Sequence, residues 1–227
     1  MIYNESGYIG DVNAWAEFLD HWQEEIENNE DLGAKYDYKS KPIDNPDEFT
    51  KFGKLPKSYV DFILAGGLNF LPLSSRSEGM EKQFFDLGMV RKFKESPDFE
   101  YWINGFTEDY GSKEELEDEN YFNFNPGQLA FRAKDYDSLL LMGSSDDYAA
   151  YLLNYSHMDL NGEWESWSFA TTVSRFPSFA HLVAQVYCYD LRTMNKSRDF
   201  CLYWNREWEA PMRKIIKRTW DWDDSIA

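Results

Sequence analysis

Closely spaced carboxylates are the side chains in this sequence whose types and spacing most readily suggest chemistry. Asp146 lies beside Asp147, and Glu163 lies two residues before Glu165. In a suitable geometry, paired acids can share the acid and base steps of a hydrolysis or can bind a divalent cation. Because the chain contains 41 acidic residues, such pairs also arise by chance. We favour a turn over a metal site at Asp146-Asp147, and we expect no bound metal.

Histidine and cysteine residues add no metal-ligand or nucleophile motif. His21, His157 and His181 form none of the HxH, HExxH or HxxxH spacings that bind zinc, and none is near Cys188 or Cys201 in the sequence. We expect His181 to be a structural histidine, His157 to lie in a loop, and both cysteines to be free thiols. GxSxG, glycine-rich phosphate-loop and protein-kinase motifs are also absent from the sequence. The sequence therefore favours a function without catalysis and without a cofactor, and an enzyme with scattered acidic residues is the less favoured class.

The net charge restricts the kinds of partner that the chain can attract. With 41 acidic and 23 basic residues, its formal net charge is −18 at pH 7. A field of this sign repels phosphate backbones and anionic lipid, and it attracts basic proteins. The charge is also unevenly distributed, because the first 48 residues and 108–119 are acidic while basic residues predominate between 192 and 218. We therefore expect a protein partner and no direct nucleic-acid or membrane ligand.

Hydrophobic spacing predicts the helices that must position these residues. An amphipathic helix should follow a cap at Asp11, with its acidic side chains facing water. A second helix should begin at Leu55-Pro56 and end at Gly66-Gly67, and a third should begin at Pro177. A further helical pattern near the C-terminus should break at Pro211. The predicted apolar stripes consist of Val12, Trp15, Ala16, Leu19, Trp22 and Ile26; Tyr59, Phe62 and Ile63; and Phe179, Leu182, Val183 and Val186.

Short apolar segments bounded by turn residues predict the strands. The expected strands are 69–73, 84–90, 139–142, 149–155 and 164–169. The last three should be antiparallel neighbours, which gives an α+β fold with a mixed or mainly antiparallel sheet flanked by helices. No repeat or linker divides the sequence, so we expect a single domain spanning 1–227. The absence of a roughly 20-residue apolar run and of a signal-peptide layout favours a cytoplasmic protein.

The order of these signals resembles a known family. Segment 55–62 reads Leu-Pro-Lys-Ser-Tyr-Val-Asp-Phe and, with Gly66-Gly67, resembles the early helix-and-glycine signature of the SUKH superfamily, the Smi/Knr-like domain. The run from 139–142 through Asp146-Asp147, Tyr151-Leu152-Leu153 and Gly162-Glu163-Trp164-Glu165 to Arg175-Phe176-Pro177-Ser178-Phe179 is similar to the second half of that domain. The similarity spans about 55–187. Segment 114–119 and the chain after Asp190 fall outside the pattern.

The resemblance implies a role in protein recognition. Bacterial members of the superfamily are immunity proteins that neutralise polymorphic toxins, often nucleases, in bacterial competition, and fungal relatives regulate cell-wall synthesis through protein partners. We therefore expect a toxin inhibitor whose cognate toxin has a basic surface; the alternative is a regulatory or scaffolding interaction domain of the same fold without a toxin partner. The acidic run is either a docking loop or a solvated surface loop. The candidate partner-binding residues are Asp109, Glu114, Glu115, Glu117, Asp118, Glu119, Asp146 and Asp147.

Overall fold

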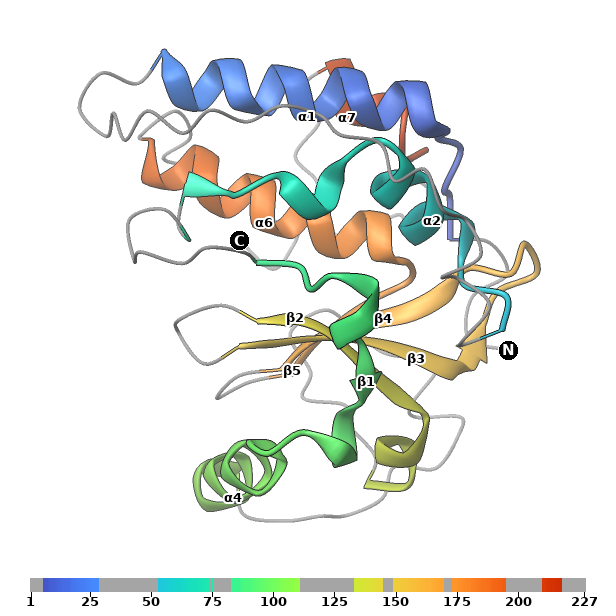
Figure 1. Cartoon of the computed structure of the whole chain (residues 1–227), viewed down its shortest axis with the longest axis vertical. Helices are drawn as coiled ribbons and strands as arrows, with labels where there is room; N and C mark the ends of the chain where they lie inside the picture. The colour runs from blue at the N-terminus through green and yellow to red at the C-terminus, as the bar shows by residue number, and fades with distance from the viewer. Residues whose placement is uncertain are drawn as a thin grey trace, which may run out of the picture.

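A five-stranded antiparallel sheet forms the centre of the fold, and helices lie on both of its faces (Figure 1). The computed structural model describes residues 6–28, 53–73, 75, 83–110, 133–144, 149–169, 173–194 and 210–217. Its strands follow the chain in the order β1-β2-β3-β4-β5, and each neighbouring pair is antiparallel. The strands are β1 Arg91–Lys92, β2 Leu139–Ser144, β3 Ala150–Met158, β4 Trp164–Phe169 and β5 Val173–Phe176. The α-helices are α1 Val12–Glu27, α2 Lys57–Leu64, α4 Phe99–Tyr110, α6 Phe179–Thr193 and α7 Ala210–Arg213. The predicted α+β class is confirmed.

The first helix forms as its spacing predicts. Asp11 has extended backbone angles and its Oδ1 accepts a hydrogen bond from the amide of Ala14 at 2.8 Å, so it caps α1. One face of α1 is buried, and it includes Trp15, Leu19 and Trp22 from the predicted stripe. The acidic side chains therefore occupy the opposite face.

Helices α2 and α6 also follow their sequence signals. Pro56 occupies the cap position immediately before α2 and not its first helical position. Gly66 follows the helix in the left-handed region, at a φ of 92°, which a residue without a Cβ adopts most easily. The four predicted stripe residues of α6, from Phe179 to Val186, are all buried.

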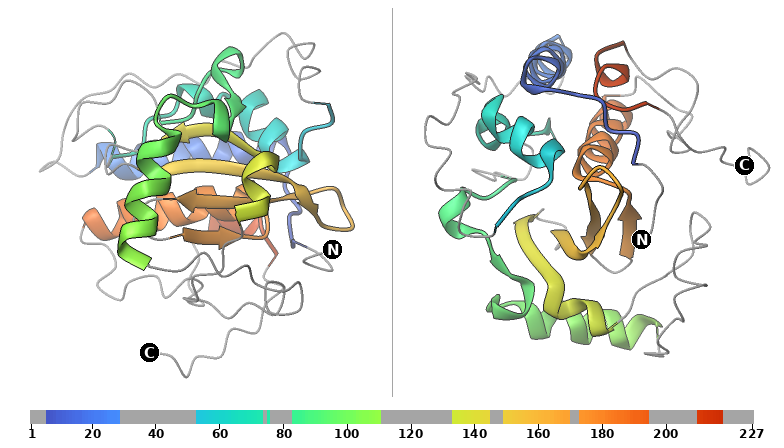
Figure 2. Two further views of the ribbon diagram at one scale, coloured as in Figure 1. Left: turned by 90° about the horizontal axis from the view of Figure 1, so that it is seen from below. Right: turned by 90° about the vertical axis from the view of Figure 1, so that its right-hand side faces the viewer.

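The sheet is covered on both faces, and this explains the imperfect alternation in its sequence. Tyr151 and Leu153 of β3 belong to the core formed with α1, α2 and α6, whereas Leu152 belongs to a second core with residues of α4. Figure 2 shows the same two layers, with α4 alone among the described α-helices on its side of the sheet. Strands with two buried faces contain nearly continuous apolar runs, so their side-chain direction cannot be read from alternation.

Two predicted strands are wrong. At 69–73 the chain forms no strand: the 3₁₀ turn η3 Gly67–Asn69 ends at its first residue, and the amide of Leu73 donates to the carboxylate of Asp190 at 2.6 Å. At 84–90, Phe84 makes one isolated bridge with Gly143 before the 3₁₀ turn η4 Leu87–Met89, and the strand itself starts at Arg91. Both runs are buried and apolar, and a short buried run is compatible with either a strand or an irregular segment.

Among the described α-helices and strands, three were not predicted: α4, β1 and β5. Each is short or lies beside polar residues, so its own sequence gives a weak periodic signal. Helix α7 contains Pro211 near its start, which fits the expected break at this residue. None of the helices that the structure describes combines the length and the apolar character needed to span a membrane.

Candidate protein-binding surface

The solvent face of α1 carries a stripe of carboxylates. Glu17, Asp20, Glu24 and Glu27 follow one another at steps of three or four residues, so they lie along one side of the helix, and all four are exposed. The helix contains no lysine or arginine. We call these four residues the acidic stripe.

The acidic stripe reduces the stability of its own helix. Like charges three or four residues apart repel each other by about 0.2–0.5 kcal/mol per pair, and the stripe contains such pairs along its whole length. Glu24 and Glu27 also lie near the C-terminal end of α1, where the helix dipole is unfavourable to negative charge. Lys214 contacts Glu17, but both side chains are more than half exposed, and such surface pairs contribute little. The stripe therefore cannot be explained by helix stability.

The buried face of α1 holds the stripe in a fixed position. The ring of Trp22 lies 4.5 Å from that of Phe70 and 5.1 Å from that of Tyr187, and its Nε1 donates to Asp190 at 3.0 Å. The ring of Phe18 lies 5.0 Å from that of Tyr187. Interlocked aromatic rings with a satisfied indole N–H prevent rotation of the helix. A partner would meet carboxylates on a helix that the core holds in place.

A second surface feature is the hairpin that joins β3 to β4. Tyr155, Met158 and Leu160 have exposed fractions of 41%, 49% and 63%, and the ring of Tyr155 lies 6.1 Å from that of Trp164 at the base of the hairpin. Figure 2 shows this hairpin extending from one end of the sheet. Aromatic side chains and methionine are enriched at protein interfaces, so the hairpin is a second candidate contact surface, separate from the acidic stripe.

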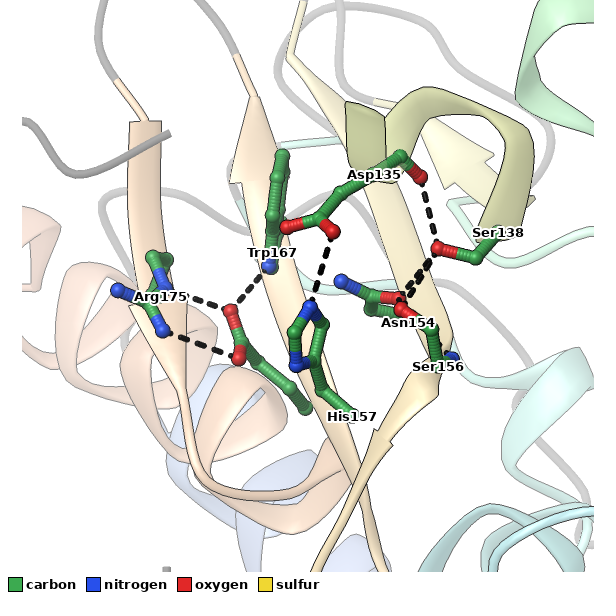
Figure 3. A network of polar contacts seen from close by, with 8 residues as sticks. Asp135, Ser138, Asn154, Ser156, His157, Trp167 and Arg175 are labelled. Atoms are coloured by element: carbon green, nitrogen blue, oxygen red, sulfur yellow. Dashed lines mark hydrogen bonds and ion pairs between the residues drawn. The ribbon is translucent and has the colours of Figure 1, made fainter. Parts of the chain in front are cut away.

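A buried polar network lies on the face of the sheet opposite α1 (Figure 3). Glu165 of β4 accepts hydrogen bonds from Arg175 of β5 through Nε at 2.5 Å and Nη2 at 3.1 Å, and from Trp167 Nε1 at 2.5 Å. Neither the glutamate nor the arginine side chain is exposed. This bidentate contact between guanidinium and carboxylate compensates both buried charges.

The same network extends to β3. His157 Nε2 lies 3.0 Å from Asp135 Oδ1, and Ser138 Oγ lies 2.8 Å from Asn154 Oδ1. Asp135 and Ser138 belong to the 3₁₀ turn η6 Ala133–Ser138, so these contacts fasten η6 to the strand. His157 was expected in a loop but lies in β3, where a register shift between Asn154 and Met158 locally alters the strand pairing.

The paired acids of the sequence have separate partners. Glu165 accepts hydrogen bonds from the guanidinium of Arg175. Glu163 instead accepts a hydrogen bond from the amide of Ser58 at 2.9 Å, at the start of α2. In the described part of the chain, no group of three or more histidine, cysteine or acidic side chains has a geometry that could hold a metal ion. Glu163 and Glu165 therefore do not form the joint site that their spacing allowed.

His181 has the structural role that the sequence predicted. Its Nδ1 is 2.8 Å from the hydroxyl of Ser178, one turn earlier, and the ring is buried. Burial disfavours the charged ring and lowers the pKa of His181 to about 3. The side chain is therefore neutral at physiological pH. Cys188, which lies in the same helix, is a half-buried thiol, and Cys201 falls outside the described residues.

The predicted partner-binding residues fall almost wholly outside the described residues. These are Glu114, Glu115, Glu117, Asp118, Glu119, Asp146 and Asp147. The backbone of Asp109 lies in α4. The acidic stripe was anticipated only as the solvated face of the first helix, although its spacing of three and four residues was visible in the sequence.

Comparisons with known proteins give no identification. The chain matches no family model, no curated protein and no solved structure. The SUKH superfamily therefore remains a resemblance in sequence motifs, and the function has to be inferred from the surface and the buried groups.

Proposed function

We propose that this chain acts by binding a basic protein, and specifically that it is an immunity protein that neutralises a toxin in bacterial competition. The observation that carries the proposal is the acidic stripe, where exposed carboxylates repeat along a helix that contains no lysine or arginine. The resemblance to the SUKH superfamily supports the biological role, and the net charge of −18 supports the choice of a basic partner.

The physical basis is electrostatic steering followed by apolar contact. Screening at physiological salt restricts the attraction between exposed charges to about 8 Å, so several aligned carboxylates are more effective than one. Such an arrangement accelerates the encounter with a positively charged groove. Charge at the rim of an interface contributes mainly to rate and specificity, so the affinity of the complex also needs desolvated apolar contact.

The proposal is tested with the protein product of the adjacent upstream gene, where an immunity gene is expected to have its toxin. The triple variant D20N/E24Q/E27Q removes three charges from the stripe without deleting side-chain volume. The matched control E95Q/D98N/E100Q removes three exposed acids in and beside α4. At about 0.5 kcal/mol per charge, the stripe variant should bind about tenfold more weakly, chiefly through a slower association rate, whereas the control should bind like the unmodified protein.

Three outcomes would contradict the proposal. Binding that is indifferent to salt and to the stripe variant would exclude recognition by charge. Failure of the unmodified chain to protect cells from that toxin, despite intact complex formation, would instead favour a regulatory or scaffolding domain. Turnover of a substrate by the purified protein alone would indicate an enzyme.

A further inference from the structure

Three segments that are distant in the sequence meet at a buried group of carboxylates. They are the N-terminal segment 6–10, the start of α2, and the turn that joins β3 to β4. Asp61, Asp159 and Glu163 contribute the carboxylates, with exposed fractions of 6%, 6% and 2%. We call these three residues the carboxylate cluster. It shares no residue with the acidic stripe.

Asp159 is well supplied with hydrogen-bond donors. Its Oδ2 accepts from the amide of Ser6 at 2.7 Å, and its Oδ1 accepts from the amides of Asn161 and Glu163 at 2.8 Å each. Three amide donors stabilise the charged form of a carboxylate. Asp159 therefore fastens the N-terminal segment to the hairpin turn.

Asp61 has a cation and a phenol as partners. Tyr8 donates its hydroxyl hydrogen to Asp61 Oδ2 at 2.7 Å, and Lys57 Nζ contacts the same oxygen. Trp15 Nε1 donates to the Tyr8 hydroxyl at 3.1 Å, which connects the cluster to α1. Burial and the nearby carboxylate of Asp61 raise the pKa of Tyr8 above its ordinary value. The tyrosine therefore stays protonated and serves as a donor.

Glu163 has neither a cation nor three donors. Its partners are the amide of Ser58, at 2.9 Å, and the hydroxyl of Ser58. Pro56 provides no side-chain cap for α2, so the carboxyl group of Glu163 occupies the place of a cap from outside the helix. Of the three carboxyl groups, Glu163 is therefore the least compensated.

The charges of the cluster do not balance if all three acids are ionised. Among the described residues, Lys57 is the cation in contact with the cluster, and its side chain is 58% exposed. Lys217, in the 215–217 segment that pairs with the N-terminal segment, is exposed to solvent. Burial raises the pKa of Glu163 to about 7; the two hydrogen bonds from Ser58 oppose this rise, and the charges of Asp159 and Asp61 add smaller increases.

We propose that Glu163 is a proton-operated latch, which holds the N-terminal segment and the β3–β4 turn against α2 when protonated and releases them when ionised. When protonated, the carboxyl group of Glu163 can donate a hydrogen bond to the Ser58 hydroxyl. It then adds no negative charge to the cluster. Ionisation places a third negative charge in the cluster, and opening allows water to solvate it. Because the hairpin carries Tyr155, Met158 and Leu160, the latch controls how rigidly this apolar surface is presented.

Amide hydrogen exchange of the full chain tests the latch. The reporters are the amides of Ser6 and Ser58, which donate to Asp159 and Glu163. If the latch opens to a state in which Glu163 has the ordinary pKa of 4.5, the opening equilibrium should rise about 40-fold between pH 5 and pH 7. Protection factors corrected for intrinsic exchange should fall by this factor, and the Leu152 amide in β3 is the reference.

Two variants and one direct titration complete the test. Glu163→Gln should make the protection of Ser6 and Ser58 independent of pH, and Glu95→Gln, an exposed glutamate, should preserve the pH response. The carboxyl carbon of Glu163, followed by NMR in the unmodified protein, should titrate near pH 7. A midpoint below pH 5, an unchanged pH response in Glu163→Gln, or an equal loss of protection at Leu152 would overturn the latch.

Discussion

Breaking the buried ion pair between Glu165 and Arg175 should destabilise the sheet strongly. The two groups are joined by contacts of 2.5 Å and 3.1 Å, and neither side chain is exposed. Glu165→Gln keeps the size of the side chain but leaves the guanidinium of Arg175 without its charged partner. Removing one member of a buried pair costs about 3–5 kcal/mol, because the remaining charge has lost its solvation without compensation. The free energy of unfolding should fall by this amount in urea titrations followed by tryptophan fluorescence.

A double-mutant cycle separates the interaction energy of the pair from the effect of removing each charged side chain. Arg175→Met alone leaves the buried carboxylate of Glu165 without this guanidinium but with its hydrogen bond from Trp167, whereas Glu165→Gln combined with Arg175→Met removes both charges. The double variant should be more stable than the sum of the single effects predicts, by at least about 2 kcal/mol. A cost below about 1 kcal/mol for Glu165→Gln, or simple addition of the two single effects, would refute the compensation of charge within this pair.

Three further outcomes are expected in the same unfolding assay. Since the pKa of Glu163 is raised to about 7 in the folded state, its contribution is fully present below pH 4.5 and is lost as the pH rises to about 7; Glu163→Gln should remove roughly 3 kcal/mol of this pH dependence, and an unchanged slope would contradict it. Gly67→Ala would place a Cβ 2.4 Å from the ring of Phe62, so it should cost about 1–3 kcal/mol, and a neutral effect would mean that the ring moves freely. Asp11→Ala removes the cap bond to Ala14 and should cost about 1 kcal/mol, whereas Asp11→Asn should cost much less.

The two candidate features make different demands on the molecule. The acidic stripe on α1 needs only a rigid helix and an exposed face, and the aromatic core under Trp22 supplies the rigidity. The latch at Glu163 needs the opposite, a buried group whose charge is poorly compensated. The acidic stripe and the latch can therefore change independently. The charge-removal variants probe the stripe, and Glu163→Gln probes the latch.

Much of the fold could be predicted because its signals are local. Helix α1 was recognisable from Asp11 and the apolar residues after it, and β4 was predicted with the bounds that the structure shows. The strands expected at 69–73 and 84–90 were wrong, because a short buried apolar run does not specify whether its backbone pairs with a neighbouring strand. There the amide of Leu73 bonds to Asp190 instead of joining the sheet.

The sequence by itself determined the sign of the electric field, the periodicity of the helices and the presence of antiparallel strands, since these depend on composition and on neighbours a few residues away. Only the tertiary structure decided what each acid does. Glu163 meets Ser58 across 105 residues, and Asp159 meets Ser6 across 153. Protonation depends on burial and on the charges nearby in space, and spacing along the chain does not specify either of them. Glu165 and Glu163, two residues apart, therefore became an ion pair in one case and the candidate latch in the other.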